Sequence, residues 1–419
     1  MTAALLRLNA RTFASLHASR NYRYFFAGQV VSQTGSWMQR IAQGWLVLQL
    51  THSPVAVGIL ALAQFLPFTV FGLFAGVIVD RLDARRTVIG TQAAQMVLAS
   101  VLAGLALAGV AQPWQIYVLA ALNGLLLVLD APSRQQLTYR MVGPLELPNA
   151  VALNSSLFNA ARIFGPALGG VLIAAVGIGW CFGINAISFL AVLAGLLAMR
   201  TSEFFPLESG RRPQILRGTR DGLAYVRSQP TMMIVLALTV VMSTFCFNFN
   251  VLLPVLAKRT LEAGPQTLGL LSALFGGGAL VGALLAANRG RASLRWMIAG
   301  AGLLSTAELM LAPERSVPIV GLLLFAAGVG FTVWSANSNS SLQLAAPDHL
   351  RGRVVGLYYY AFNGTGPVGG ILAGWLSAHG GTTLAFFVAG AAGLVGTFFA
   401  AARLRERRHL HPLAGRARA

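Results

Sequence analysis

Four ionisable side chains lie within long apolar stretches of this 419-residue sequence: Arg40, Asp130, Arg162 and Glu308. An isolated charge at the centre of a membrane helix costs at least about 2.5–3.5 kcal/mol, so each group needs a partner or a function. For the two arginines the sequence leaves two interpretations open. Each guanidinium either binds an anionic or carbonyl group of another molecule or pairs with a neighbouring carboxylate or carbonyl of the protein.

The two carboxyl groups are candidates for reversible proton binding, because burial changes the affinity of a carboxyl group for a proton. Asp130 and Arg134 are four residues apart and can pair across one helical turn. Asp130 either titrates or acts as a brace that pairs with Arg81, Arg85 or Arg134. Glu308 is in a stretch expected at the periphery of a helix bundle, where it either titrates or extends towards the lipid boundary.

Polar side chains mark one face of the first apolar stretch. Gln29, Gln33, Trp37 and Arg40 recur at steps of three or four residues, which places them on one side of a helix. Polar residues of membrane helices face a bundle interior or water. Three other stretches carry further candidates for the same lining: Asn123, Asn248, Asn250, Trp334 and Asn337. These residues predict a water-filled central cavity.

Several kinds of site are excluded by the residue types present. A phosphate-binding P-loop needs Gly-Lys-Ser/Thr, and the sole lysine, Lys258, lies in Leu-Ala-Lys-Arg. The six histidines fall in predicted breaks or tails, and no His-Glu-x-x-His, Gly-x-Ser-x-Gly or Cys-x-x-Cys motif occurs. The glycine run 276–278 indicates close helix packing rather than phosphate binding. We therefore expect no metal site, no cofactor and no enzymatic activity.

The elements that position these residues are apolar helices long enough to cross a bilayer. With 56% apolar and 10% charged residues the chain does not have the composition of a soluble protein. A crossing helix needs about 20 apolar residues. The sequence predicts twelve such spans, near residues 22–49, 54–79, 87–110, 113–137, 151–176, 179–199, 231–257, 266–287, 294–312, 317–344, 353–377 and 382–403.

The net charge of +19 orients the chain rather than indicating nucleic acid as a partner. Of the 31 basic residues, 26 lie in alternate breaks that fall on one side of the predicted membrane. Three lie on the other side and two lie within spans. Because basic loops stay in the cytoplasm, both termini are expected there, in a multi-pass protein of the lipid bilayer.

The longest break divides the chain into two similar halves. We expect a cytoplasmic segment (1–21), a six-helix bundle (22–199), a linker whose residues 215–226 form an amphipathic surface helix (200–230), a second six-helix bundle (231–403) and a basic cytoplasmic tail (404–419). A Gly-Pro-x-x-Gly-Gly segment at Gly165 is echoed by Gly-Pro-x-Gly-Gly at Gly366, about 200 residues later. This indicates a duplicated bundle.

The break after the second span carries the most specific motif. Gly76 is followed four residues later by Asp80-Arg81, and then by the basic pair Arg85-Arg86. This loop resembles the signature of the major facilitator superfamily, although Asp83 and Ala84 depart from the general pattern. The resemblance implies a cytoplasmic gate that latches two halves together, formed by Gly76, Asp80, Arg81, Arg85, Arg86 and Arg134.

The fifth span carries a second motif. Its residues Arg162, Gly165, Pro166, Gly169 and Gly170 resemble the antiporter motif of drug and metabolite exporters in that superfamily, while ordinary helix packing explains the glycines equally well. Overall the chain resembles the exporter branch typified by enterobactin exporters and macrolide efflux proteins. The resemblance implies an all-α membrane protein, with twelve transmembrane helices in two pseudo-symmetric six-helix bundles. It also implies a substrate cavity lined by spans 1, 4, 7 and 10.

The sequence thus predicts a secondary transporter of the bacterial inner membrane that exports hydrophobic or amphipathic small molecules in exchange for protons, with no requirement for an oligomer. Asp130 is the leading proton carrier, since its span is one that the resemblance places beside the cavity, and Glu308 is the second candidate. The alternatives are a proton-coupled importer of the same fold and a membrane receptor or assembly partner that does not transport.

Overall fold

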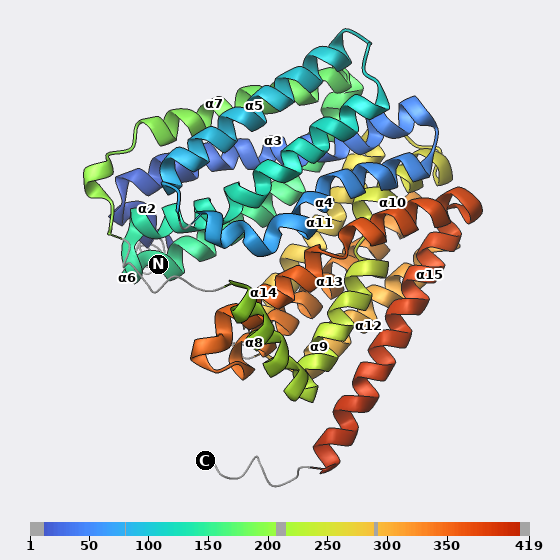
Figure 1. Cartoon of the computed structure of the whole chain (residues 1–419). Helices are drawn as coiled ribbons and strands as arrows, with labels where there is room; N and C mark the ends of the chain where they lie inside the picture. The colour runs from blue at the N-terminus through green and yellow to red at the C-terminus, as the bar shows by residue number, and fades with distance from the viewer. Residues whose placement is uncertain (1–11, 80, 207–214, 289–291, 411–419) are drawn as a thin grey trace, which may run out of the picture. The chain divides into compact units, whose positions relative to one another are not determined.

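A computed structural model describes residues 12–79, 81–206, 215–288 and 292–410, and within these ranges every regular element is a helix (Figure 1). The elements are α2 (Ala14–Ala18), α3 (Arg20–Thr51), α4 (Pro54–Val79), α5 (Ala84–Leu107), α6 (Pro113–Ala175), α7 (Ile178–Leu197), η1 (Thr201–Glu203), α8 (Ile215–Ser228), α9 (Pro230–Val241), η2 (Met242–Cys246), α10 (Phe249–Val255), η3 (Leu256–Thr260), α11 (Pro265–Asn288), α12 (Leu294–Leu311), α13 (Val317–Ala345), α14 (Asp348–Asn363) and α15 (Gly366–Leu410).

The chain divides into two compact units. The first contains Met1–His52, Ala63–Pro213 and Glu262–Ala273, and the second contains Ser53–Leu62, Gln214–Leu261 and Leu274–Ala419. Each unit therefore includes the first residues of one helix, α4 or α11, whose remainder is counted with the other unit. The division into two six-helix bundles and a linker remains a prediction, although the linker helix expected at 215–226 is present as α8.

Eight stretches of helix in the described chain are long and apolar enough to cross a membrane. Two of these stretches are interrupted, so each of them can contain two of the twelve predicted spans. α6 is 63 residues long and is interrupted at Gly143, whose φ of 70° is left-handed, while α15 is interrupted at Gly380 and Gly381. Helix α3 is not one of the eight, and it contains many polar residues. The twelve spans are consistent with this pattern, and their number stays a prediction.

Two predicted spans have internal features that the sequence pattern did not indicate. The seventh is divided among α9, α10 and the π-helical turns η2 and η3, with Asn248 between η2 and α10. The eleventh is interrupted between α14 and α15 at residues 364–365. π-helical turns inside membrane helices often mark functional positions.

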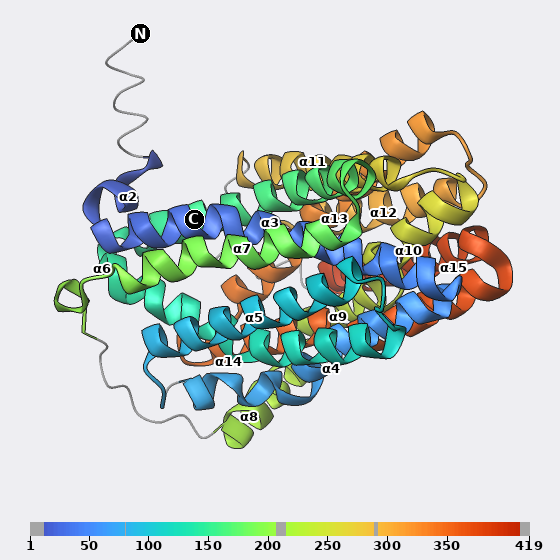
Figure 2. The same ribbon diagram turned by 90° about the horizontal axis from the view of Figure 1, so that it is seen from above.

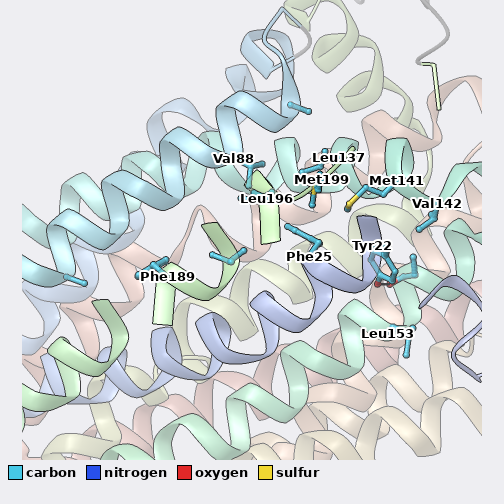
Figure 3. Packing of buried hydrophobic residues seen from close by; sticks show 14 of the residues in the cluster. Tyr22, Phe25, Val88, Leu137, Met141, Val142, Leu153, Phe189, Leu196 and Met199 are labelled. Atoms are coloured by element: carbon cyan, nitrogen blue, oxygen red, sulfur yellow. Dashed lines mark hydrogen bonds between the residues drawn. The ribbon is translucent and has the colours of Figure 1, made fainter. Parts of the chain in front are cut away.

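In the first unit α7 packs between α3 and α5, and the three helices lie side by side (Figures 1 and 2). The core at one end of these helices joins side chains of α3, α5, α6 and α7 (Figure 3). Tyr22 is fully buried there, and its hydroxyl donates to the Ala150 carbonyl at 2.9 Å. Gly28 lets α3 approach α7 closely, because a Cβ at Gly28 would lie 2.5 Å from the Val192 Cα. Small residues of this kind replace hydrophobic burial as the basis of membrane-helix packing.

The repeated glycine segments make comparable contacts in the two units. In the first, a Cβ at Gly170 would lie 2.6 Å from the Pro265 carbonyl oxygen, at the start of α11. In the second, a Cβ at Gly58, near the start of α4, would lie 2.7 Å from the Gly370 carbonyl oxygen. Each contact joins a repeated glycine to the first turns of a helix that begins with proline. This correspondence supports a duplicated architecture.

In the second unit α12 packs against α13 and α15. The glycine run 276–278 lies where α11 meets α13, and a Cβ at Gly278 would overlap the carbonyl oxygen of Phe325. A Cβ at Gly277 would be 3.8 Å from the Phe325 ring, which is an ordinary contact. Close packing by Gly278 therefore explains the run without a phosphate.

We expect Gly278→Ala to destabilise the protein by about 1–3 kcal/mol, because the added methyl group must push the α13 backbone away. Gly277→Ala is the matched control and should leave stability nearly unchanged. The measurement is the thermal unfolding midpoint of each purified variant in detergent. Equal midpoints for the two variants would contradict the packing role of Gly278.

Candidate functional site

The Asp130 carboxylate is the centre of a buried polar cluster in the first unit. Its Oδ2 lies 2.6 Å from Nη2 of Arg134, one turn further along α6. Its Oδ1 accepts hydrogen bonds from the Thr91 hydroxyl at 2.6 Å and the Gln92 amide at 3.0 Å, both on α5. Arg134 also donates through Nη1 to Oε1 of Gln29, on α3, at 2.7 Å. One ion pair thus connects three helices.

Burial makes this ion pair important for stability. Asp130 is 0% exposed and Gln29 is 4% exposed. Removing one partner of a buried ion pair costs about 3–5 kcal/mol, because the remaining charge loses its compensation. Of the three arginines considered as partners, the structure pairs Asp130 with Arg134. Gln29, expected to line a cavity, is a buried member of this cluster.

Glu308, on α12, is a second buried carboxyl group with different surroundings. It is 0% exposed, and neither carboxyl oxygen has a hydrogen-bond partner among the described residues. Its side chain lies beside the Cys246 thiol, at the end of the π-helical turn η2. The nearby Ser305 hydroxyl donates to the Ala301 carbonyl at 2.8 Å. The lipid-boundary alternative is therefore wrong, since Glu308 is fully buried and α12 packs against α15 and η2.

Arg40 and Arg162 meet at one aromatic ring. The Arg40 Cζ lies 4.5 Å from the centroid of the Trp37 ring, and the Arg162 Cζ lies 5.9 Å from the same centroid. Arg40 and Trp37 are on α3, and Arg162 is on α6. The sequence indicated each arginine separately, but it gave no signal that they share a ring.

The remaining polar candidates differ in their exposure. Gln33, Asn123 and Asn250 are half-buried. Asn248 is 6% exposed, and its side-chain amide donates to the Thr244 carbonyl at 2.8 Å. It therefore provides a hydrogen bond to a backbone carbonyl of η2, next to the break between η2 and α10. Asn337 is also mostly buried, and its Oδ1 accepts from the backbone N–H of Ser293 at 2.9 Å, at the start of α12. These last two amides have structural contacts.

Trp334 belongs to an aromatic cluster in the second unit that sequence reasoning missed. Phe247 stacks on Phe331 at a centroid distance of 4.4 Å, and Trp334 stacks on Phe362 at 5.9 Å. The cluster comprises Phe247, Phe249, Phe275, Phe331, Trp334, Tyr358 and Phe362. A usable signal was the helical spacing of 331 with 334 and of 358 with 362, which places each pair on one face.

The loop between α4 and α5 contains the signature residues. Gly76 lies within α4, and Asp80 lies outside the described residues. Arg81 is exposed in a turn. Arg85 donates through Nε to the Leu196 carbonyl at 3.0 Å, and therefore caps the C-terminal end of α7, where a cation is favourable. Its contact with Leu196 is within the first unit.

Asp83, which departs from the signature, begins α5. Its Oδ1 accepts from the Arg86 backbone N–H at 2.9 Å, and its Oδ2 lies 3.2 Å from Nη1 of Arg140. Partial burial by itself raises the pKa of Asp83, but the Arg86 hydrogen bond and the Arg140 charge outweigh it and hold the pKa below its usual range. The side chain therefore stays charged at neutral pH and ties α5 to α6.

The antiporter-like segment of α6 packs closely against neighbouring helices. A Cβ at Gly165 would lie 2.6 Å from the Trp37 Cβ, and one at Gly169 would lie 3.1 Å from the Ile41 side chain, both on α3. Pro166 is buried inside the helix. The glycines therefore have a packing role, whatever further role the motif has.

No group of three or more His, Cys, Asp or Glu residues in the described parts of the chain could hold a metal ion. Its two cysteines, Cys181 and Cys246, are buried and unpaired with each other. Four features of the described residues remain as candidates for function. They are the Asp130–Arg134 ion pair, the buried Glu308 carboxyl group, the two arginines at the Trp37 ring, and the aromatic cluster around Phe331.

The chain is similar to known transporters along nearly its whole length. Residues 10–413 match the family model described as transmembrane secretion effector. The multidrug efflux pump Tap of Mycobacterium tuberculosis is 30% identical over 406 residues, covering 91% of this chain and 92% of Tap. Macrolide efflux protein A of Streptococcus pyogenes is 23% identical over 377 residues, covering 87% and 91% of the two chains.

Among solved structures, a crystal structure of the nucleoside transporter NupG superposes with a TM-score of 0.73 at 12% identity, covering 91% of this chain and 99% of NupG. That likeness shows the major facilitator fold. The family and these relatives are transporters rather than enzymes, and they act on small molecules within a lipid bilayer. The resemblance inferred from the loop motif is thus confirmed, and the chain belongs to the transmembrane secretion effector family of the major facilitator superfamily.

Proposed function

We propose that this protein is a secondary active transporter that exports hydrophobic or amphipathic small molecules across the bacterial inner membrane by proton antiport and alternating access. The exported molecules would be drugs, siderophores or other secondary metabolites. The observation that carries the direction of transport is the 30% identity with the multidrug efflux pump Tap over 91% of this chain. The charge asymmetry of the loops supports a cytoplasmic position for both termini.

The aromatic cluster supports an apolar component in the substrate. Phe247 and Phe362 are half-buried, so part of each ring remains exposed, while Phe331 stacks on the first ring and Trp334 on the second. Flat aromatic faces bind apolar groups of varied shape, and apolar linings with a few placed polar groups are typical of small-molecule sites.

The half-buried polar residues support a polar component. In the first unit Gln33, Trp37, Arg40 and Asn123 are the candidates for substrate contact, and in the second unit Asn250 is the strongest. Gln29, Asn248 and Asn337 are weaker candidates, because each has a buried structural hydrogen bond.

For proton coupling we propose Asp130 as the first candidate and Glu308 as the second. Asp130 lies in a buried ion pair with Arg134, and a motion that separates the two side chains would leave the carboxylate without its compensating charge. Glu308 differs, because it is fully buried and no arginine pairs with it among the described residues. The two groups therefore make different contributions if both titrate in the cycle.

The loop after α4 is proposed as a cytoplasmic gate, as the family signature implies. Gly76, Arg81, Arg85 and Arg86 belong to it, together with Asp80. The contacts of Arg85 with α7 and of Asp83 with Arg140 support a loop that is held rigidly to the first unit. A loop attached to the first unit in this way would move with that unit, as a gate between two states requires.

The first prediction of this proposal concerns direction. Everted membrane vesicles that contain the protein should accumulate at least one of three probes, erythromycin, ethidium or 2-naphthoate, when respiration supplies a proton gradient, and a protonophore should abolish the accumulation. Vesicles from cells without the protein are the control. Accumulation in right-side-out vesicles only would favour an importer, and binding without flux would favour a receptor.

The second prediction concerns coupling. Asp130→Asn should abolish uphill transport in energised vesicles while downhill exchange of the same probe remains measurable, because the neutral amide mimics the protonated acid. Glu308→Gln is assayed in parallel, and Glu203→Gln is the control, since Glu203 is an exposed acid that pairs with Arg200. The abundance of each variant is measured by immunoblot.

Uphill transport by Asp130→Asn at the wild-type rate would show that Asp130 is a brace. If Glu308→Gln then loses uphill transport, coupling resides at Glu308. If neither variant is affected, proton coupling through these two carboxyl groups is contradicted.

A further inference from the structure

The ring of Trp37 lies close to two guanidinium groups. Phe158 of α6 packs edge-on against this ring at a centroid distance of 5.4 Å. Gly165, also on α6, allows the Trp37 backbone to approach, because any Cβ there would be 2.6 Å from the Trp37 Cβ. Arg40 and Arg162 then lie within 4.5 and 5.9 Å of the ring centroid. The position of the tryptophan therefore fixes where the two guanidinium groups meet.

Two positive charges that lie at one ring inside a membrane unit repel each other. Each cation–π contact returns about 0.5–2 kcal/mol. That is less than the cost of a charge at the middle of a membrane helix. An anion beside the Arg40 guanidinium would compensate its charge and would also lie near Arg162, since both guanidinium groups lie at the Trp37 ring.

Three acidic residues of the first unit are paired with arginines other than Arg40. Asp130 pairs with Arg134, Asp83 pairs with Arg140, and Glu203 pairs with Arg200. Arg40 takes part in no ion pair within the described ranges, where its recorded contact is with Trp37. Its side chain is half-buried, so part of its surface remains accessible.

We infer that Arg40 and Arg162 form one anion-binding site, which receives a carboxylate group of the transported molecule while Trp37 contacts the adjacent apolar part. Guanidinium groups present paired N–H donors that match a carboxylate, and such charge-assisted hydrogen bonds are stronger than neutral ones. The inference rests on the proposed function and narrows its substrate class to amphipathic anions. A cationic substrate would be repelled from this site.

The test uses the purified full-length protein in nanodiscs of zwitterionic lipid and two probes of equal shape, 2-naphthoate and 2-naphthamide. Their dissociation constants are measured by calorimetry against empty nanodiscs. The wild-type protein should bind the carboxylate at least about tenfold more tightly than the carboxamide. Arg40→Gln should reduce this ratio to about one.

Arg20→Gln is the matched control, because Arg20 is on the same helix and also lies over an aromatic ring, that of Tyr24, at 5.3 Å. It should retain the wild-type ratio. Arg162→Lys keeps the charge but loses the paired donors, so it should give an intermediate ratio. Arg40→Lys serves the same purpose if Arg40→Gln does not fold. A wild-type ratio near one, or a ratio unchanged in the Arg40 and Arg162 variants, overturns the inference.

A lipid phosphate has the same chemistry as a substrate anion, so a second set of nanodiscs contains phosphatidylglycerol. If this lipid removes the preference for 2-naphthoate, the site binds a headgroup and the assignment to substrate is overturned. Export in everted vesicles with no carboxylate preference would leave the proposed function intact and remove this inference. If the protein prefers 2-naphthoate but does not export it, the anion site is retained and the proposed export function is contradicted.

Discussion

The ion pair between Asp130 and Arg134 constrains the first unit, because a carboxylate buried this deeply cannot lose its partner without a cost of several kcal/mol. Its hydrogen bonds extend to Thr91 and Gln92 on α5, and through Arg134 to Gln29 on α3. This contact therefore ties helices α3, α5 and α6 to one another. The side chain that stabilises the unit is also the one that we propose first for proton coupling.

The buried acid of the second unit, Glu308, has no arginine partner of the kind that Asp130 has among the described residues. Glu308 has no hydrogen bond to either oxygen among the described residues, and it lies beside a π-helical turn rather than a regular helix. A π turn contains one more residue than an α turn and shifts the side chains that follow it. Returning the turn to α geometry would move Cys246 relative to Glu308. Thus the two units share similar glycine contacts, at Gly170 and Gly370, but differ in how an internal charge is compensated.

Features set by composition and local pattern were predictable from the sequence: the all-helical membrane fold, the family signature near Gly76, and the close packing at Gly165 and Gly278. Features set by the rotation of one helix about its axis relative to another were not. The two arginines reach the Trp37 ring only when α3 and α6 pack in one particular register. The aromatic cluster forms only when α10, α11, α13 and α14 pack against one another. Glu308 was misplaced at the lipid boundary for the same reason, since its spacing in α12 does not reveal that η2 and α15 cover it.

The two proposed charge sites have a joint consequence for the energetics of transport. An anion that leaves the cytoplasm and a proton that enters it both move in the direction favoured by a membrane potential that is negative inside. Each charge that crosses contributes about 2.3 kcal/mol per 100 mV. A monoanion exchanged for one proton would therefore be driven by about twice that amount, whereas exchange of a monovalent cation for one proton would gain nothing from the potential. The proposed anion site at Trp37 would thus do more than select a substrate, because the sign of the charge it admits determines whether the membrane potential adds to the pH difference in driving export.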